Sequence, residues 1–240
     1  YTSGAGWVDR AIVPGAWPDG GWQICVVPMD EVRARIDPSV WRPLGMRASA
    51  SYLTDFSGIE LPAEAILGAP GDYHRQPWFS GGAIRFAAVQ LGGAAALFDA
   101  ARAELRALRR TDDPFQRARA GEMAAAIEGA TLWLRGAAAL LDRTPAAFAA
   151  DPPPDDPTGA RIVAHANLTR TAVAEACARV LELVDRSVGM RGLLQPHPIE
   201  RIGRDLRLYL RQPAPDAALA GAGGYALAQE SPSLDLWSEA

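Results

Sequence analysis

Short runs of branched and aromatic residues alternate with turn-forming residues over the first 70 positions. Val8–Val13 and Trp22–Pro28 are two such runs, and a stretch rich in Pro and Gly separates them at positions 14–21. Between Ala48 and Leu61, small or polar residues alternate with larger apolar ones, and Pro62 ends the pattern. We therefore expect about four strands in a small antiparallel sheet, which needs a partner surface to be stable.

Beyond residue 76, apolar residues recur at the three- to four-residue spacing of one helix face. The predicted helices are Ala83–Arg109, Phe115–Leu141, Thr158–Ser187, Ile199–Arg211 and a short last one at Asp216–Ala228. Many interior positions are alanine, which lets helices approach one another closely. The pattern predicts an α+β chain, with a small antiparallel β-domain at residues 1–75 and a four-helix bundle at residues 76–240.

Two connections between the predicted helices carry stop and start signals. In Thr111–Pro114 an aspartate directly precedes a proline, as at the first turn of many helices. Asp151–Pro157 consists only of aspartate and proline, which predicts a rigid, solvated connection.

Composition excludes several classes of function. The 24 basic residues are all arginine, so Schiff-base, phosphate-loop and kinase chemistry that needs a lysine is excluded. The net charge of −4 argues against a nucleic-acid partner, and charges interrupt every apolar run before the ~18 residues of a membrane helix. Cys25 and Cys177 form no CxxC pair, and His74, His165 and His197 lack metal-ligand spacing. We expect a cytoplasmic protein without a metal site or membrane segment.

Three features together resemble the acyl-CoA dehydrogenase family. Gly45–Ser51 and Phe56–Glu64 are similar to the end of that family's β-domain. Gly189–Gly192, followed by Pro198–Arg201 and the Arg204-Asp205 pair, is similar to a stretch of its C-terminal bundle. The order of the elements, a β-domain before antiparallel helices, is the third feature. The family's N-terminal helical domain has no counterpart in these residues.

The resemblance implies a flavoprotein. Family subunits hold FAD with its ring between the β-domain and the bundle, and they assemble as homodimers or homotetramers in which FAD reaches across a subunit boundary. The substrate is implied to be a small molecule or an acyl thioester. An alanine-rich bundle buries limited apolar area per helix, and association is one way to bury more.

Candidate flavin contacts follow from matching positions. Thr2 or Ser3 matches the family's hydroxyl near flavin N5, and a hydroxyl either donates or accepts a hydrogen bond. Arg109 or Arg110 matches the arginine that pairs with the FAD pyrophosphate. The family's Phe-Gly after that arginine is replaced by Thr111–Pro114, whose two aspartates would repel a pyrophosphate.

A glycine pair matches the segment that contacts the adenine side of FAD. Gly189 and Gly192 are retained, while Arg186 and Met190 add bulk where the family has glutamine and glycine. Either the glycines let the backbone approach a ligand, or Gly189 simply ends a helix.

The family's catalytic base is missing at its usual place. Counting from the Arg204-Asp205 pair puts Pro213 at the position of the glutamate that removes the α-proton. Proline also lacks the N–H with which the family polarises the thioester carbonyl. The second known location of the base is closed as well, because His74–Phe98 contains no Asp or Glu, and Asp216 is the nearest carboxylate to the main location.

Three functions remain open. The chain is an FAD-dependent oxidoreductase of altered chemistry, a flavin-dependent monooxygenase of the same fold, or a non-catalytic homologue that acts as a binding or assembly subunit. A monooxygenase needs no carboxylate base and often carries a histidine in the pocket. His197, next to Pro198, is the candidate for that role.

Overall fold

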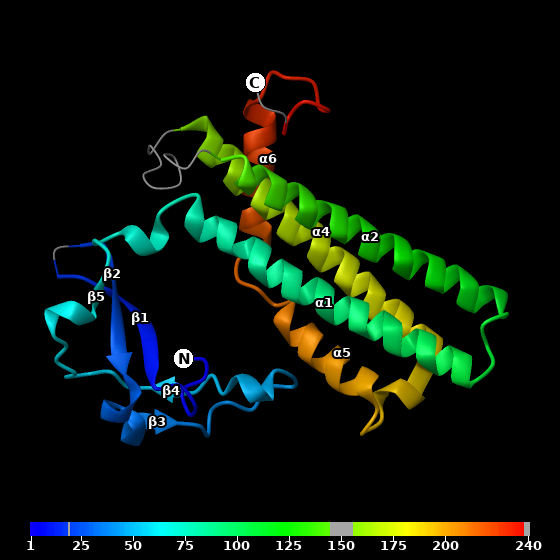
Figure 1. Cartoon of the computed structure of the whole chain (residues 1–240), viewed down its shortest axis with the longest axis horizontal. Helices are drawn as coiled ribbons and strands as arrows, with labels where there is room; N and C mark the ends of the chain where they lie inside the picture. The colour runs from blue at the N-terminus through cyan, green and yellow to red at the C-terminus, as the bar shows by residue number, and fades with distance from the viewer. Residues whose placement is uncertain (19, 145–155, 238–240) are drawn as a thin grey trace. The chain divides into compact units, whose positions relative to one another are not determined.

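The computed structural model describes residues 1–18, 20–144 and 156–237. It divides into two compact units, Tyr1–Arg75 and Gln76–Ala240 (Figure 1). The first unit holds short strands, and the second holds all the long helices. The predicted rigid connection at 151–157 lies mostly outside the described residues, so it stays a prediction.

The first unit contains a three-stranded antiparallel sheet in the order β1-β2-β5. β1 (Arg10–Ala16) pairs with β2 (Trp22–Pro28) along its whole length, and β5 (Ile66–Leu67) adds to the other edge of β2. A separate two-stranded ladder joins β3 (Ile36–Asp37) to β4 (Leu53–Thr54). The small antiparallel β-domain is therefore present.

The expected strand at 48–61 is mostly wrong. Only Leu53–Thr54 is a strand there, Arg47–Ser49 is a 3-10 helix, and Met46 and Ala50 have φ of 55° and 44°. Backbone in this left-handed region cannot continue a strand. The alternating aromatic and apolar residues, Tyr52, Phe56 and Ile59, instead pack on the unit's small core of Ala5, Ala11, Met29 and Val32.

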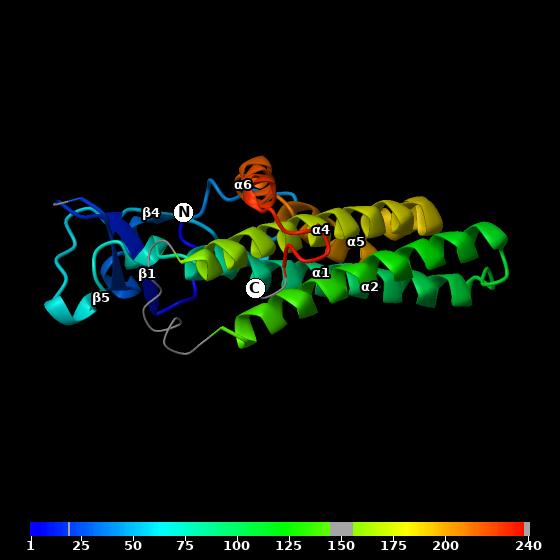
Figure 2. The same cartoon turned by 90° about the horizontal axis from the view of Figure 1, so that it is seen from above.

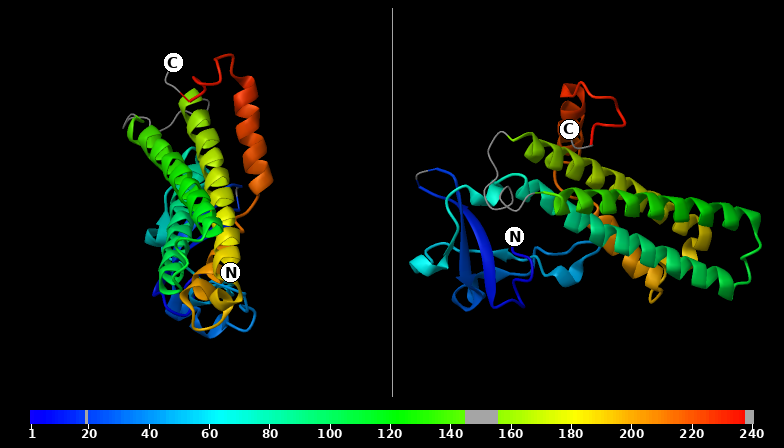
Figure 3. Two further views of the ribbon diagram at one scale, coloured as in Figure 1. Left: turned by 90° about the vertical axis from the view of Figure 1, so that its right-hand side faces the viewer. Right: turned by 45° about the horizontal axis from the view of Figure 1, so that its top comes forward.

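Five long helices form the described part of the second unit: α1 (Trp78–Ala107), α2 (Pro114–Asp142), α4 (Pro157–Val188), α5 (Pro198–Tyr209) and α6 (Pro215–Ala228). α1, α2 and α4 run alongside one another, and α5 packs on α1 (Figures 1 and 3). α6 crosses α4 instead of running along it (Figure 2). The bundle is thus built from α1, α2, α4 and α5, with α6 laid across it.

Proline opens four of these helices for a shared reason. α2, α4, α5 and α6 each begin at a proline, whose fixed φ suits the first turn and whose missing N–H is not needed there. Asp113 caps α2 by accepting the N–H groups of Phe115 and Gln116, and Asp156 caps α4 by accepting that of Thr158.

Small residues set the spacing between the helices. Ala87, Ala94 and Ala101 recur every seven residues along α1 and are fully buried in the core. Gly93 faces Leu206 of α5, and an added Cβ would lie 3.4 Å from its Cδ1. Such close contacts let short side chains fill the core without voids.

α1 and α2 are long and apolar enough to cross a membrane by length and composition alone. The core helix of a soluble protein passes the same test. Here both helices line one packed core with α4, in which Leu97 of α1 and Met123 of α2 are fully buried. The two helices are therefore weak evidence for a membrane span.

Removing a core side chain tests this packing. Leu97→Ala should lower the free energy of unfolding by about 2–5 kcal/mol, because Leu97 is fully buried and its loss leaves a cavity. Leu227→Ala on α6 is the matched control, since Leu227 is 89% exposed, and it should change stability by less than about 0.5 kcal/mol. Urea unfolding of both variants makes the comparison, and equal losses would contradict the packing described.

Candidate functional site

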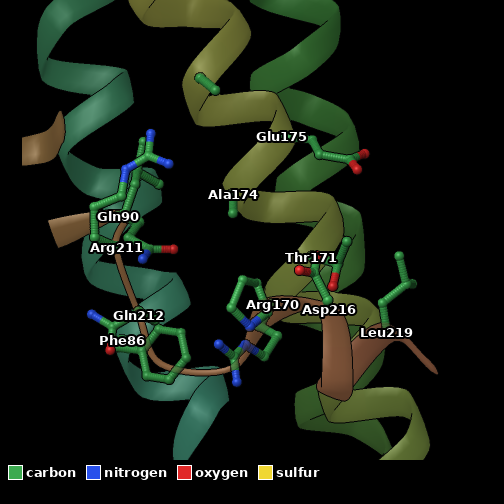
Figure 4. Close-up of a pocket in the computed structure, with 13 residues that line it drawn as sticks. Phe86, Gln90, Arg170, Thr171, Ala174, Glu175, Arg211, Gln212, Asp216 and Leu219 are labelled. Atoms are coloured by element: carbon green, nitrogen blue, oxygen red, sulfur yellow. The ribbon is translucent and has the colours of Figure 1, made fainter. Parts of the chain in front are cut away.

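A cavity of about 500 Å³ lies in the helical unit, among α1, α4 and the turn that joins α5 to α6. α1 contributes Phe86 and Gln90, α4 contributes Arg170 and Glu175, and the turn contributes Gln212 (Figure 4). Its volume lies in the ordinary range for a small-molecule site. Pro213, which the count from the Arg204-Asp205 pair predicts to be the family's base position, belongs to the same turn.

Two prolines shape this turn. α5 ends at Tyr209, and Pro213 and Pro215 lie on either side of Ala214, which has a φ of 49°. Arg170 donates a hydrogen bond from Nη2 to the carbonyl oxygen of Pro213 at 2.8 Å. The turn is therefore anchored to α4 through its main chain.

Arg170 is itself held against an aromatic ring. Its guanidinium carbon lies 5.2 Å from the centre of the Phe86 ring, a cation–π contact between α4 and α1. Partial burial lowers the pKa of Arg170 from its ordinary value, yet an arginine keeps its charge at neutral pH. One cation thus joins α1, α4 and the turn at the cavity wall.

Two glutamine side chains converge on one carbonyl group beside the cavity. Gln90 Nε2 donates to the Tyr209 carbonyl oxygen at 3.0 Å, and Gln212 Nε2 donates to the same oxygen at 2.9 Å. Gln90 is 1% exposed, and among residues 1–18, 20–144 and 156–237 its Oε1 has no hydrogen-bond partner. The role of Gln90 was not predicted from the sequence. The one signal for it was that a polar residue stands on the apolar face of a predicted helix.

Two acidic side chains line the cavity. Pro213 is exposed and offers no proton acceptor in its side chain. Asp216, in the first turn of α6, and Glu175 of α4 both line the cavity and are exposed. Asp216 is therefore near the turn, as its place in the sequence suggests, but outside it.

His197 lies away from this cavity. Its Nδ1 accepts the N–H of Ile199 at 3.2 Å and so caps the start of α5, while Nε2 lies 3.7 Å from Glu104 Oε2. α5 spans 12 residues, so about 18 Å of helix separates His197 from the turn where Pro213 lies. As placed here, His197 is a helix cap beside Glu104.

The candidate flavin hydroxyls lie in the first unit. Thr2 forms a β-bridge with Tyr52, and its N–H donates to the Tyr52 carbonyl at 2.8 Å. Ser3 Oγ lies 2.9 Å from Ser51 Oγ, which in turn lies 3.0 Å from Ser49 Oγ. The fold thus brings together three hydroxyl groups, and of these only Ser3 was predicted from the sequence as a flavin contact.

The candidate phosphate arginines follow α1. Arg109 has a φ of 53°, and the N–H of Arg110 returns to the Leu105 carbonyl, which ends the helix. Arg110 Nη2 lies 3.4 Å from Asp113 Oδ2. The hydrogen-bond network also orients the Gln116 amide so that its oxygen accepts from Arg110 at 3.0 Å.

Asp113 therefore does two things at once. It caps α2, and the N–H groups of Gln116 and Phe115 together with Arg110 hold the pKa of its carboxyl below the usual value. The aspartate that the sequence predicts to repel a phosphate is a partner of Arg110, so an anion at this place has to compete with it.

The glycine pair has a packing role in the structure. Gly189 ends α4 with φ of 69° and ψ of −157°, a conformation that is essentially restricted to glycine. Gly192 is buried, and a Cβ there would lie 3.1 Å from Val188 and 3.3 Å from Ile199. Between them, Arg191 pairs with Glu104 of α1 at 2.8 Å. This segment fastens the ends of α4 and α5 to α1.

Two buried groups on α4 lie outside the cavity. Burial raises the pKa of the Cys177 thiol to about 12, so it is not a reactive thiolate at neutral pH. Burial lowers the pKa of His165, whose ring lies 5.6 Å from Trp133 and 5.5 Å from Trp237. Neither group had been assigned a role from the sequence.

The residues present fit the ring of a flavin better than the pyrophosphate and adenine parts of FAD. The three serine hydroxyls suit the donor and acceptor atoms at the edge of a flavin ring. Arg109 and Arg110 carry the charge that a pyrophosphate needs, but Asp113 already neutralises part of it. Gly192 offers no open cradle, because its neighbours fill the space of a Cβ.

A small antiparallel β-unit followed by a bundle, with a cavity at the turn between its last two helices, defines the acyl-CoA dehydrogenase-like class of α+β folds. A family model confirms the class: residues 84–211 match the acyl-CoA dehydrogenase C-terminal domain. The chain belongs to the acyl-CoA dehydrogenase family. A search of curated proteins found no match.

Solved structures share the fold. Dibenzothiophene monooxygenase from Paenibacillus sp. A11-2 aligns with a TM-score of 0.80 and 21% identity, over 98% of this chain and 65% of that one. Methanesulfinate monooxygenase from Pseudomonas fluorescens gives 0.77 and 24%, over 98% and 64%. Glutaryl-coenzyme A dehydrogenase, in complex with glutaryl-CoA, gives 0.67 and 24%, over 86% and 51%. The chain therefore spans between about half and two thirds of these relatives.

The capping role of His197 makes a testable prediction. His197→Ala should lower the free energy of unfolding by about 1 kcal/mol, since the Ile199 N–H loses its acceptor. His197→Asn should retain most of the stability, because asparagine is a strong helix cap. Urea unfolding measures both, and an equal loss in the two variants would show that the imidazole does more than cap α5.

Proposed function

We propose that this chain is the β-unit and helical bundle of a flavin-dependent oxidoreductase that does not use a carboxylate from the α5–α6 turn. The observation that carries the proposal is Pro213 at the family's base position, with its carbonyl bound to Arg170 at 2.8 Å. A prolyl residue has no side-chain proton acceptor and no N–H for a substrate carbonyl. Dehydrogenation of a saturated acyl thioester needs both.

The relatives support a flavin as the cofactor. The dibenzothiophene monooxygenase is also known with FMN and indole, and XiaF from Streptomyces sp. with FADH2. A bound flavin would supply the redox chemistry itself. In this chain, Thr2 and Ser3 would meet the ring edge, Arg109 and Arg110 would meet phosphate, and Gly189 and Gly192 hold the helix ends near which the family binds adenine.

A monooxygenase reaction suits this set of residues, because it needs no carboxylate to remove an α-proton. His197 would not serve it in the present arrangement, since it caps α5 far from the turn. The chain's own contribution would be the cavity, whose walls orient a small molecule and exclude water. We also propose a homodimer or homotetramer in the cytoplasm without nucleic-acid or membrane partners, and light scattering tests the assembly.

A second candidate is a dehydrogenase with Asp216 as its base. The observation in its favour is that Asp216 lines the same cavity from the first turn of α6. Its side chain is exposed, however, and it lies three residues beyond the family's position. A subunit that binds without reacting is the remaining alternative, and an absorbance spectrum without flavin bands would favour it.

Turnover of acyl thioesters separates these candidates. We expect dye-linked dehydrogenase activity on short, medium and long acyl-CoAs, with added FAD, to be ~10²–10⁴-fold below ordinary rates of ~10 s⁻¹. Pro213→Glu should raise it if the position is correctly assigned. Ordinary turnover that disappears in Asp216→Asn would overturn the proposal in favour of the second candidate.

Comparing FAD with FMN tests the phosphate contact. Replacing Arg109 and Arg110 together with alanine should weaken FAD binding at least about tenfold, because charge-assisted hydrogen bonds to the pyrophosphate are lost. FMN, which has no pyrophosphate, should bind the variant and the native chain more nearly alike. Arg106→Ala, in the last turn of the same helix, is the control. Unchanged FAD affinity in the double variant would place the phosphates elsewhere.

A further inference from the structure

The amide of Gln90 carries an unused acceptor at the side of the cavity. Gln90 is 1% exposed and lines the cavity, and Figure 4 shows it on α1 facing α4. Within the described residues, its Oε1 is buried and accepts no hydrogen bond. Buried polar atoms are nearly always hydrogen-bonded, so such an exception calls for an explanation.

The orientation of this amide is fixed by its other end. Gln90 Nε2 donates to the Tyr209 carbonyl oxygen at 3.0 Å. A flipped amide would place two acceptors against each other, Oε1 and that carbonyl oxygen. Gln212 donates to the same oxygen at 2.9 Å, which uses its second lone pair. Gln90 Oε1 is therefore an acceptor in every arrangement that keeps this network.

The lining of the cavity around Gln90 combines apolar and charged side chains. Phe86, Leu210 and Leu219 supply hydrocarbon surface to the cavity. Two arginines line the cavity: Arg170 is engaged by Phe86 and the Pro213 carbonyl, and Arg211 is exposed. A guest therefore meets hydrocarbon surface together with the exposed charged side chains of Arg211, Glu175 and Asp216. Within the described residues, Gln90 Oε1 is the buried acceptor of the cavity lining that has no hydrogen-bond partner.

We propose that this cavity binds a small, largely apolar molecule that donates one N–H or O–H to Gln90 Oε1. The inference deepens the proposed function, on which it rests, by naming the chemical class of its substrate. The carbonyl of an acyl thioester offers only acceptors and would meet Oε1 unfavourably. Gln90 thus favours ligands that carry a hydrogen-bond donor. The reacting end of a saturated acyl-CoA has none.

Two ligands of the same shape test this selection without flavin or turnover. Indole carries an N–H, and benzofuran has an oxygen acceptor in its place. Calorimetric titration of the intact chain should show indole binding about tenfold more tightly, the difference expected for one hydrogen bond to an otherwise unpaired acceptor. Equal affinities, or no binding of either ligand at millimolar concentration, would overturn the inference.

Variants then assign the preference to one side chain. Gln90→Leu should remove the indole preference while benzofuran binding stays the same or improves. Gln212→Leu is the matched control, because it lines the same cavity and donates to the same carbonyl, and the ratio of the two affinities should persist. If Gln90→Leu does not fold, the native comparison of the two ligands still decides.

The failure of this inference can be told apart from the failure of the proposed function. Equal affinities in a chain that binds flavin would overturn only the ligand class. A clear indole preference in a chain that binds neither FAD nor FMN would overturn the flavin proposal and leave Gln90 as the selecting residue.

Discussion

The turn between α5 and α6 is held by side chains that all donate to main-chain carbonyls. Gln90 and Gln212 share the Tyr209 oxygen, and Arg170 takes that of Pro213. If the turn moved, the buried amide of Gln90 would lose its partner at a cost of about 1–3 kcal/mol, while the exposed Arg170 contact would cost less. The cavity exists in its present shape because these contacts fix the turn relative to α1 and α4.

This anchoring gives the turn a structural role in the architecture of the helical unit. The helices on either side of the turn keep their packing through Gly93, Leu206 and the Arg207–Asp185 ion pair. A new reaction then requires only that the cavity's polar groups match another substrate. Fold and function are separable in this way in many enzyme classes.

Much of the fold was readable from the sequence. The helices begin within a few residues of their expected starts because proline and aspartate mark them, and the four-helix core follows from apolar spacing. The strand expected at 48–61 failed because alternation there reflects aromatic residues packing on a small core, not a ladder. Gln90, the Ser3–Ser51 contact and the cap at His197 depend on residues distant in sequence or on side-chain direction, which spacing does not reveal.

The two free thiols lie one in each compact unit and differ in burial, Cys25 being half-buried and Cys177 fully buried. Chemical labelling of these two thiols therefore reports how often each unit opens. A thiol-specific reagent reaches Cys177 only when the helical core opens, so its labelling rate follows the population of opened bundle, while Cys25 follows the β-unit. The local stability of each unit can thus be measured separately in the unmodified protein.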